Sequence, residues 1–128
     1  MWGIIMSVKK VLIAGSRSFT DYSRAKEYID LCISRIRKEN EIIIISGGAR
    51  GADLLGEKYA KDNGFKVKKY PAEWDVYGRG AGIKRNKTMV EVSDYVICFW
   101  DGQSRGTKST IDFAKNLKKP LRIKKYNF

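Results

Sequence analysis

Histidine is absent from this chain of 128 residues, and cysteine and proline each occur only twice. Without histidine the chain lacks the commonest metal ligand and the commonest general base, so we expect no metal site, and any proton transfer falls to carboxylates, lysine, tyrosine or water. Cys32 and Cys98 lie far apart in apolar surroundings, which is typical of buried thiols rather than of a disulfide. A reducing, cytoplasmic setting is therefore expected.

A long hydrophobic run is also missing. The apolar start at residues 1–6 is far shorter than the roughly 20 residues that span a bilayer, and it lacks the basic beginning of a signal peptide. We therefore expect no membrane association. Residues 1–7 are a candidate N-terminal extension, because Met6 is an alternative start. A length of 128 residues with 43% hydrophobic content predicts a single domain over residues 1–128.

Acidic residues are few, with 14 Asp and Glu against 26 Lys and Arg, which leaves a net charge of +12. This balance favours an anionic partner such as a nucleotide, a nucleic acid or an acidic surface. The alternative is a lysine-rich surface that is simply solvated. The positions of the arginines are therefore more informative than the total charge.

Strand-like and helix-like runs alternate along the chain. Apolar runs typical of strands lie at residues 11–14, 42–45, 65–70, 95–100 and 121–123. Helical periodicity is found at residues 22–36, 54–63, 83–92 and 108–119. Thr20 is the expected N-cap of the first helix, Leu117 is expected to face the core, and residues 124–126 to be solvated.

This alternation predicts a single α/β domain with a Rossmann-like open sheet of about five mainly parallel strands and helices on both faces. The strand at 65–70 is expected at an edge, because it alternates apolar and basic residues. Ligands of such sheets bind beyond the carboxyl ends of the strands. Residues 71–82 predict a long loop without regular structure, in which Trp74 and Tyr77 could stack on a base, pack internally or form a subunit contact.

Two glycine-rich corners each lead from a strand into a helix. The first, residues 47–53, has three glycines that allow close approach to a bound group, and its Asp53 is either a ribose ligand or an acid that stabilises the helix start. The second, residues 101–107, ends in Gly106-Thr107, which suits a phosphate at a helix N-terminus. Neither matches the dinucleotide or Walker spacing. Ordinary tight turns and helix caps are the structural alternatives.

Arginines add paired donors that suit phosphate, and Arg85 is the strongest candidate among Arg17, Arg50, Arg85 and Arg105. Together these segments predict a crevice whose ligand-binding residues are Gly15, Ser16, Arg17, Gly47, Gly48, Arg50, Gly51, Asp53, Arg85, Asn86, Asp101, Ser104, Gly106 and Thr107.

Residues 15–17, 46–53, 81–86 and 101–107, in this order, resemble the YspA/YpsA-related branch of the SLOG superfamily. The resemblance covers about residues 8–123 and implies a Rossmann-like fold that binds nucleotides or nucleotide-derived ligands. The superfamily also includes the DNA-processing DprA proteins and the LOG phosphoribohydrolases. Related folds make a homodimer an expectation, and no cofactor is expected beyond a nucleotide-type ligand.

The LOG enzymes, which release the base from a nucleoside monophosphate, carry a P-G-G-x-G-T-x-x-E motif and an arginine that Arg85 resembles. Here Thr110 stands at the glutamate position, and Ser104-Arg105 replace the preceding glycines. The candidates for a catalytic role are Arg85, Asp101 and Glu73, with Asp53 as a further carboxylate. Three functions stay open: binding or sensing of a phosphorylated ribose ligand, LOG-like N-glycosidase activity, and DprA-like nucleic-acid binding.

Overall fold

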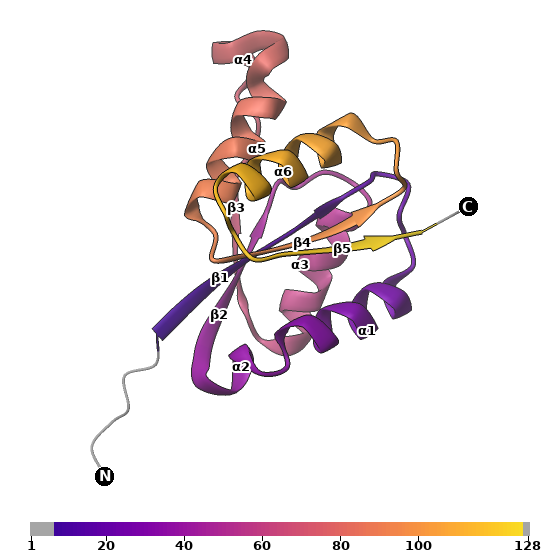
Figure 1. Cartoon of the computed structure of the whole chain (residues 1–128), viewed down its shortest axis with the longest axis vertical. Coiled ribbons are helices and arrows are strands. Elements are labelled where there is room, and N and C mark those ends of the chain that lie inside the picture. Colours follow the sequence, from indigo (N-terminus) through magenta and orange to yellow (C-terminus); the bar gives the residue numbers. More distant parts are fainter. Residues whose placement is uncertain (1–6, 127–128) are drawn as a thin grey trace.

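A computed structural model describes residues 7–126 and shows one open sheet of five parallel strands in the order β3-β2-β1-β4-β5 (Figure 1). The strands are β1 Ser7–Gly15, β2 Asn40–Ser46, β3 Lys66–Lys69, β4 Tyr95–Trp100 and β5 Leu121–Lys125. The helices are α1 Tyr22–Ile33, α2 Ile36–Glu39, α3 Ala52–Asn63, α4 Trp74–Tyr77, the 3₁₀ turn η1 Gly78–Gly80, α5 Ala81–Val92 and α6 Arg105–Asn116. The predicted Rossmann-like fold is confirmed.

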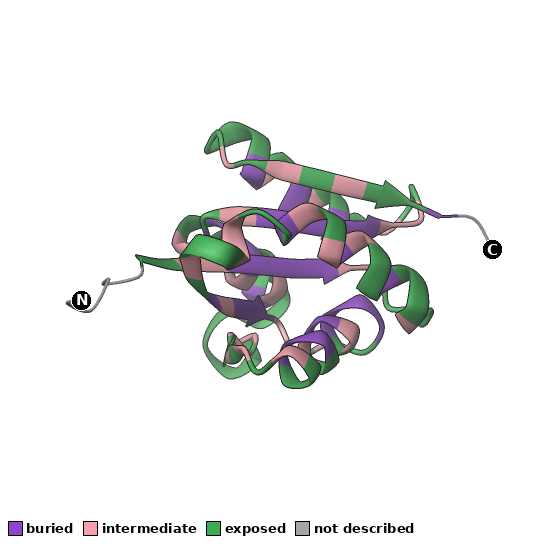
Figure 2. Cartoon of the chain, turned by 90° about the horizontal axis from the view of Figure 1, so that it is seen from below, coloured by how far each residue is buried: buried purple, intermediate pink, exposed green. Residues whose placement is uncertain are grey.

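Helices cover both faces of the sheet (Figure 1): α1 and α3 lie on one face, and α5 and α6 on the other. The central strands each contain a continuous apolar run, at residues 11–14 in β1, 42–45 in β2 and 95–100 in β4, as expected for a parallel sheet between two helical layers. Figure 2 shows these strands largely buried, whereas β5 alternates between partly buried and exposed residues at its edge of the sheet. The lysines of β3 mark the opposite edge, as predicted.

Helix α3 lies unusually close to the central strand. A Cβ on Gly56 would stand 2.8 Å from the Ile13 side chain, so only glycine allows this helix to approach β1 so closely. The helix ends where the sequence predicts, because Gly64 adopts the left-handed conformation with φ 71° and its N–H bonds to the last turn. Strand β2, helix α3 and the connection between them are thus held firmly against β1.

Several local predictions were wrong. Asp21, rather than Thr20, caps α1, because its carboxylate accepts the Arg24 N–H at 3.1 Å. The first helix is broken into α1 and α2. The segment at 71–82 contains α4, η1 and the start of α5. Leu117 is exposed.

The predicted solvated tail is also wrong at Tyr126, which is buried with its ring 4.5 Å from that of Phe19. Phe19 in turn stacks on Phe99 of β4 at 4.7 Å, so the end of the chain packs against the loop that follows β1.

The candidate extension at residues 1–7, with Met6 as an alternative start, falls outside the described residues except for Ser7, which begins β1. Among the helices within residues 7–126, none combines the length and the apolar character needed to cross a bilayer.

Candidate functional site

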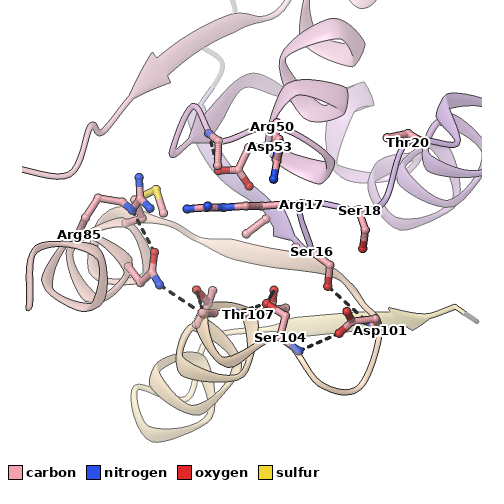
Figure 3. Close-up of a pocket in the computed structure, with 17 residues that line it drawn as sticks. Ser16, Arg17, Ser18, Thr20, Arg50, Asp53, Arg85, Asp101, Ser104 and Thr107 are labelled. Atoms are coloured by element: carbon pink, nitrogen blue, oxygen red, sulfur yellow. Dashed lines mark hydrogen bonds between the residues drawn. The ribbon is translucent and has the colours of Figure 1, made fainter. Parts of the chain in front are cut away.

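The candidate site lies where the chain connections diverge. From β1 the chain leads through α1 to β2 on one side, and from β4 through α6 to β5 on the other, so the carboxyl ends of β1 and β4 flank an open crevice. A cavity of about 730 Å³ occupies this position (Figure 3). Its walls are formed by Ala14, Gly15, Ser16, Arg17, Ser18, Thr20, Ala49, Arg50, Asp53, Arg85, Asn86, Met89, Asp101, Ser104, Gly106, Thr107 and Thr110.

Most of the sequence-predicted ligand residues are brought together in this cavity, but three glycines of the first corner are not among its lining residues: Gly47, Gly48 and Gly51. A Cβ on Gly51, at φ 81°, would meet the backbone carbonyl of Arg17. A Cβ on Gly47 would lie 2.7 Å from Arg85 Nη1. These two glycines permit close contacts within the protein, which agrees with the structural alternative given for this corner.

Asp53 is the buried carboxylate of the first corner. Its Oδ2 accepts the Ala49 N–H at 3.2 Å, and only 6% of the residue is exposed. Burial raises the pKa of Asp53 to about 6, although the Ala49 hydrogen bond and the nearby Arg85 charge oppose the shift. The cavity therefore holds an acid that is costly to keep ionised and that gains from a hydrogen-bond donor.

Arg85 connects three parts of the fold. Its Nη1 donates to the carbonyl oxygens of Gly47 at 2.9 Å and Tyr70 at 3.2 Å, and its Nε donates to Asn86 Oδ1 at 3.0 Å. Asn86 Nδ2 donates onward to the Gly106 carbonyl at 3.3 Å. Burial lowers the pKa of the half-buried Arg85 guanidinium. Nη1 thus joins the residues that follow β2 and β3, and Nε holds Asn86 on α5. Of the three guanidinium nitrogens, Nη2 is the one without a hydrogen bond to the described residues, which leaves it for a ligand.

Arg17 is placed more openly than Arg85. In Figure 3 its side chain runs across the cavity, between Asp53 on one wall and Thr107 on the other. Within residues 7–126 its guanidinium makes no hydrogen bond or ion pair. Its backbone is fixed, because Ser16 N–H donates to the Phe99 carbonyl at 2.9 Å and the Phe19 ring stacks on Phe99. Its charge acts on its neighbours in the cavity, because it favours the ionised form of Asp53 and lowers the pKa of Arg85. A cation without a hydrogen-bonded partner on an anchored loop suits an anionic ligand.

The second corner is organised by capping. Asp101 Oδ1 accepts the N–H groups of Gln103 and Ser104, each at 2.8 Å, and Ser104 Oγ accepts the Thr107 N–H at 3.4 Å. The backbone hydrogen bonds that Asp101 accepts lower the pKa of its carboxyl group, and the bond from Ser104 has the largest effect. The N–H groups of Arg105 and Gly106, which precede the capped Thr107, have no acceptor among the described residues and lie at the positive end of the helix dipole. Asp101 is therefore engaged in its own loop, while the helix start is open to an anion.

Glu73 does not reach the cavity. It lines a smaller hollow of about 190 Å³, and Arg85 lines both this hollow and the main cavity.

Thr110 lines the main cavity, and its hydroxyl donates to the Gly106 carbonyl at 3.3 Å. Six lining residues were not predicted as ligand residues: Ala14, Ser18, Thr20, Ala49, Met89 and Thr110. For Ser18 and Thr20, the position after a buried strand was a usable signal. No group of three Cys, Asp or Glu side chains suited to a metal ion occurs among residues 7–126.

Fold and cavity together define a Rossmann-like protein with an open cavity at the point where its strand order reverses. The family model for YspA and cpYpsA-related SLOG proteins, YAcAr, matches residues 9–77, and the chain belongs to this family. It is 32% identical over 120 residues to the Gene 61 protein of Mycobacterium phage D29, covering 89% of this chain and 94% of the phage protein.

Three solved structures share the fold. DNA processing protein A of Helicobacter pylori, described for its single-stranded DNA binding mode, has a TM-score of 0.67 and 26% identity, covering 90% of this chain and 64% of that one. DprA of Streptococcus pneumoniae has a TM-score of 0.67 at 18% identity, covering 91% of this chain and 50% of its own. The structural genomics target TM1055 has a TM-score of 0.60 at 19% identity, over 91% and 72%. The chain thus spans about half to two thirds of the DprA chains.

Proposed function

We propose that the cavity binds a nucleotide-derived ligand through a phosphorylated ribose. The observation that carries this proposal is the composition of the cavity, in which the free Arg17 guanidinium and the capped start of α6 face the buried carboxylate of Asp53. Phosphate requires cations and free N–H groups, whereas ribose offers hydroxyl donors. The two walls match these two needs.

The phosphate end is assigned to the second corner. The first N–H groups of α6 and the Arg17 guanidinium converge there, and a charge-assisted hydrogen bond contributes on the order of 1.5–3 kcal/mol. Arg85 supports the same end through Nη2 and positions both corners through its other nitrogens.

The ribose end is assigned to Asp53. A hydroxyl that donates to its carboxylate would favour the ionised form and lower the pKa, so affinity should rise as the pH increases through about 6. A cavity of about 730 Å³ has room for a whole nucleotide.

Calorimetry with AMP, ADP-ribose, NAD and cyclic nucleotides tests the assignment. We expect Arg17→Gln to weaken binding about 10- to 100-fold without changing thermal stability. Arg35→Gln, which removes an exposed arginine at the junction of α1 and α2, is the matched control and should bind like wild type. Absence of binding to all of these nucleotides, or equal losses in both variants, would contradict the proposal.

Nucleic-acid binding is a second candidate, favoured by the net charge of +12 and by the likeness to the H. pylori protein. This candidate predicts affinity for single-stranded DNA that falls with salt, with a slope of about −0.7 per phosphate neutralised. Fluorescence anisotropy of a labelled oligonucleotide between low and high salt measures it, and a salt-independent signal would count against it.

A LOG-like N-glycosidase is the enzymatic alternative. Thr110 cannot supply a carboxylate, and Asp101 is engaged by its loop, which leaves Asp53 as the carboxylate of the cavity with a raised pKa. Release of free base from nucleoside monophosphates by wild type, lost in Asp53→Asn, would favour this activity over binding alone.

A further inference from the structure

One segment of the fold lacks a covering partner among the described residues. Residues 71–83, here called the arm, contain α4, η1 and the start of α5, and Figure 1 shows α4 projecting beyond the body of the domain. Every residue from 73 to 80 is exposed, and neither α4 nor η1 buries a residue. A helix of one turn gains almost all of its stability from packing, so this surface needs a partner.

The arm also carries four of the eight exposed large hydrophobic side chains of residues 7–126. Trp74 is 56% exposed, Val76 67%, Tyr77 45% and Ile83 57%, all within ten residues of one another. Single exposed apolar residues are normal, but a cluster with two aromatic rings has the composition of an interface centre. The arm is therefore built for contact with another macromolecule.

Charge identifies the kind of partner. The arm carries Glu73 and Asp75 against Arg79, a net charge of −1 in a chain of +12. The exposed Lys84 and Lys87 follow immediately on α5, and Lys84 Nζ lies 4.7 Å from the centre of the Tyr77 ring. One patch thus combines acidic side chains at the start of α4, basic side chains on α5 and the exposed apolar side chains of the arm. Such a patch is complementary to itself when it is rotated by a half turn.

We propose that the arm is the contact between two copies of this chain. In a two-fold dimer, α4 of each copy lies against α5 of the other, so that Glu73 and Asp75 meet the Lys84 and Lys87 positions of the second copy around a shared apolar centre. The rest of the chain carries a net charge of +13, so two copies that met through other surfaces would repel each other. Nucleic acid suits the arm poorly, because Glu73 and Asp75 would face its phosphates. The inference is independent of the proposed function.

Sedimentation velocity over a concentration series tests the contact. Wild type should dimerise, and Trp74→Ala should raise the dissociation constant at least about tenfold, because a central tryptophan is a typical binding hot spot. Leu31→Ala is the matched control, since Leu31 is 74% exposed on α1, and it should dimerise like wild type. A wild type that stays monomeric at all concentrations, or a dimer weakened equally by both changes, would overturn the proposal.

A charge exchange gives the sharper test. Glu73→Lys with Asp75→Lys makes the whole patch basic, and Lys84→Glu with Lys87→Glu makes it acidic, so each double variant alone should be monomeric. Mixed together they should form a heterodimer. Mixtures that stay monomeric while wild type dimerises would place the contact elsewhere. If wild type is instead a monomer that binds single-stranded DNA, and Trp74→Ala abolishes that binding, the arm binds nucleic acid and the proposed contact between two copies is wrong.

Discussion

The two glycine-rich corners look alike in sequence but are built by different forces. The first corner depends on close approach: Gly51 lies against the Arg17 carbonyl, Gly47 against Arg85, and a carboxylate is buried beside them. The second depends on hydrogen-bonded caps from Asp101 and Ser104, and a Cβ on Gly106 would meet nothing within 4 Å. A glycine-rich corner therefore does not by itself identify a ligand-binding segment, because its glycines can instead allow close packing within the protein.

The largest expected effect tests this difference directly. Gly51→Ala places a Cβ on the Arg17 carbonyl in a backbone conformation that favours glycine, so the free energy of unfolding should fall by about 2–5 kcal/mol. Gly106→Ala is the matched change at the second corner and should alter stability by no more than about 1 kcal/mol, in the stabilising direction. Urea denaturation measures both. Equal losses would show that the corners are built alike.

Asp53 gives the next largest effect, and its sign is unusual for an acid. Because its pKa is raised in the folded state, the stability is intact below about pH 4 and falls as the pH rises to about 6. At neutral pH the loss is about 3 kcal/mol. Asp53→Asn should therefore stabilise the protein at pH 7 and match wild type at pH 4, while ligand affinity falls. A variant that is less stable at pH 7 would refute this.

The smallest effect concerns the cap of the second corner. Ser104→Ala removes the acceptor of the Thr107 N–H and should lower the free energy of unfolding by about 1 kcal/mol, whereas Ser104→Asp should retain the cap. Thermal denaturation separates the two. If aspartate failed to restore stability, the Ser104 hydroxyl would have a role other than capping.

The sheet could be read from the sequence because buried strands in a parallel sheet are continuous apolar runs, as in residues 42–45 and 95–100. The missed elements lack such a signal. Helix α4 is one turn with no buried residue, so no apolar periodicity marks it. Thr20 and Asp21 can both cap a helix, and the path of the preceding loop decides between them.

The site could be predicted as a set of loops but not as a set of contacts. Topology brings the carboxyl ends of β1, β2 and β4 together, and in the structure Arg17, Asp53 and Ser104 line one cavity there. Which of these side chains contact one another depends on distances in the folded protein, which the sequence does not give. Arg85 was expected to hold phosphate, yet two of its nitrogens bind protein groups, and Glu73 lies in a separate hollow.

The stacking of Phe19 between Phe99 and Tyr126 has a consequence for synthesis on the ribosome. The loop that carries Arg17 is made before the two rings that anchor it, which belong to Phe99 of β4 and to Tyr126 after β5. Because such long-range contacts form only after both partners are available, a nascent chain cannot complete the support of this cavity wall until Tyr126 has emerged. A message cut short before Tyr126 would yield a chain in which the Arg17 loop lacks its final support.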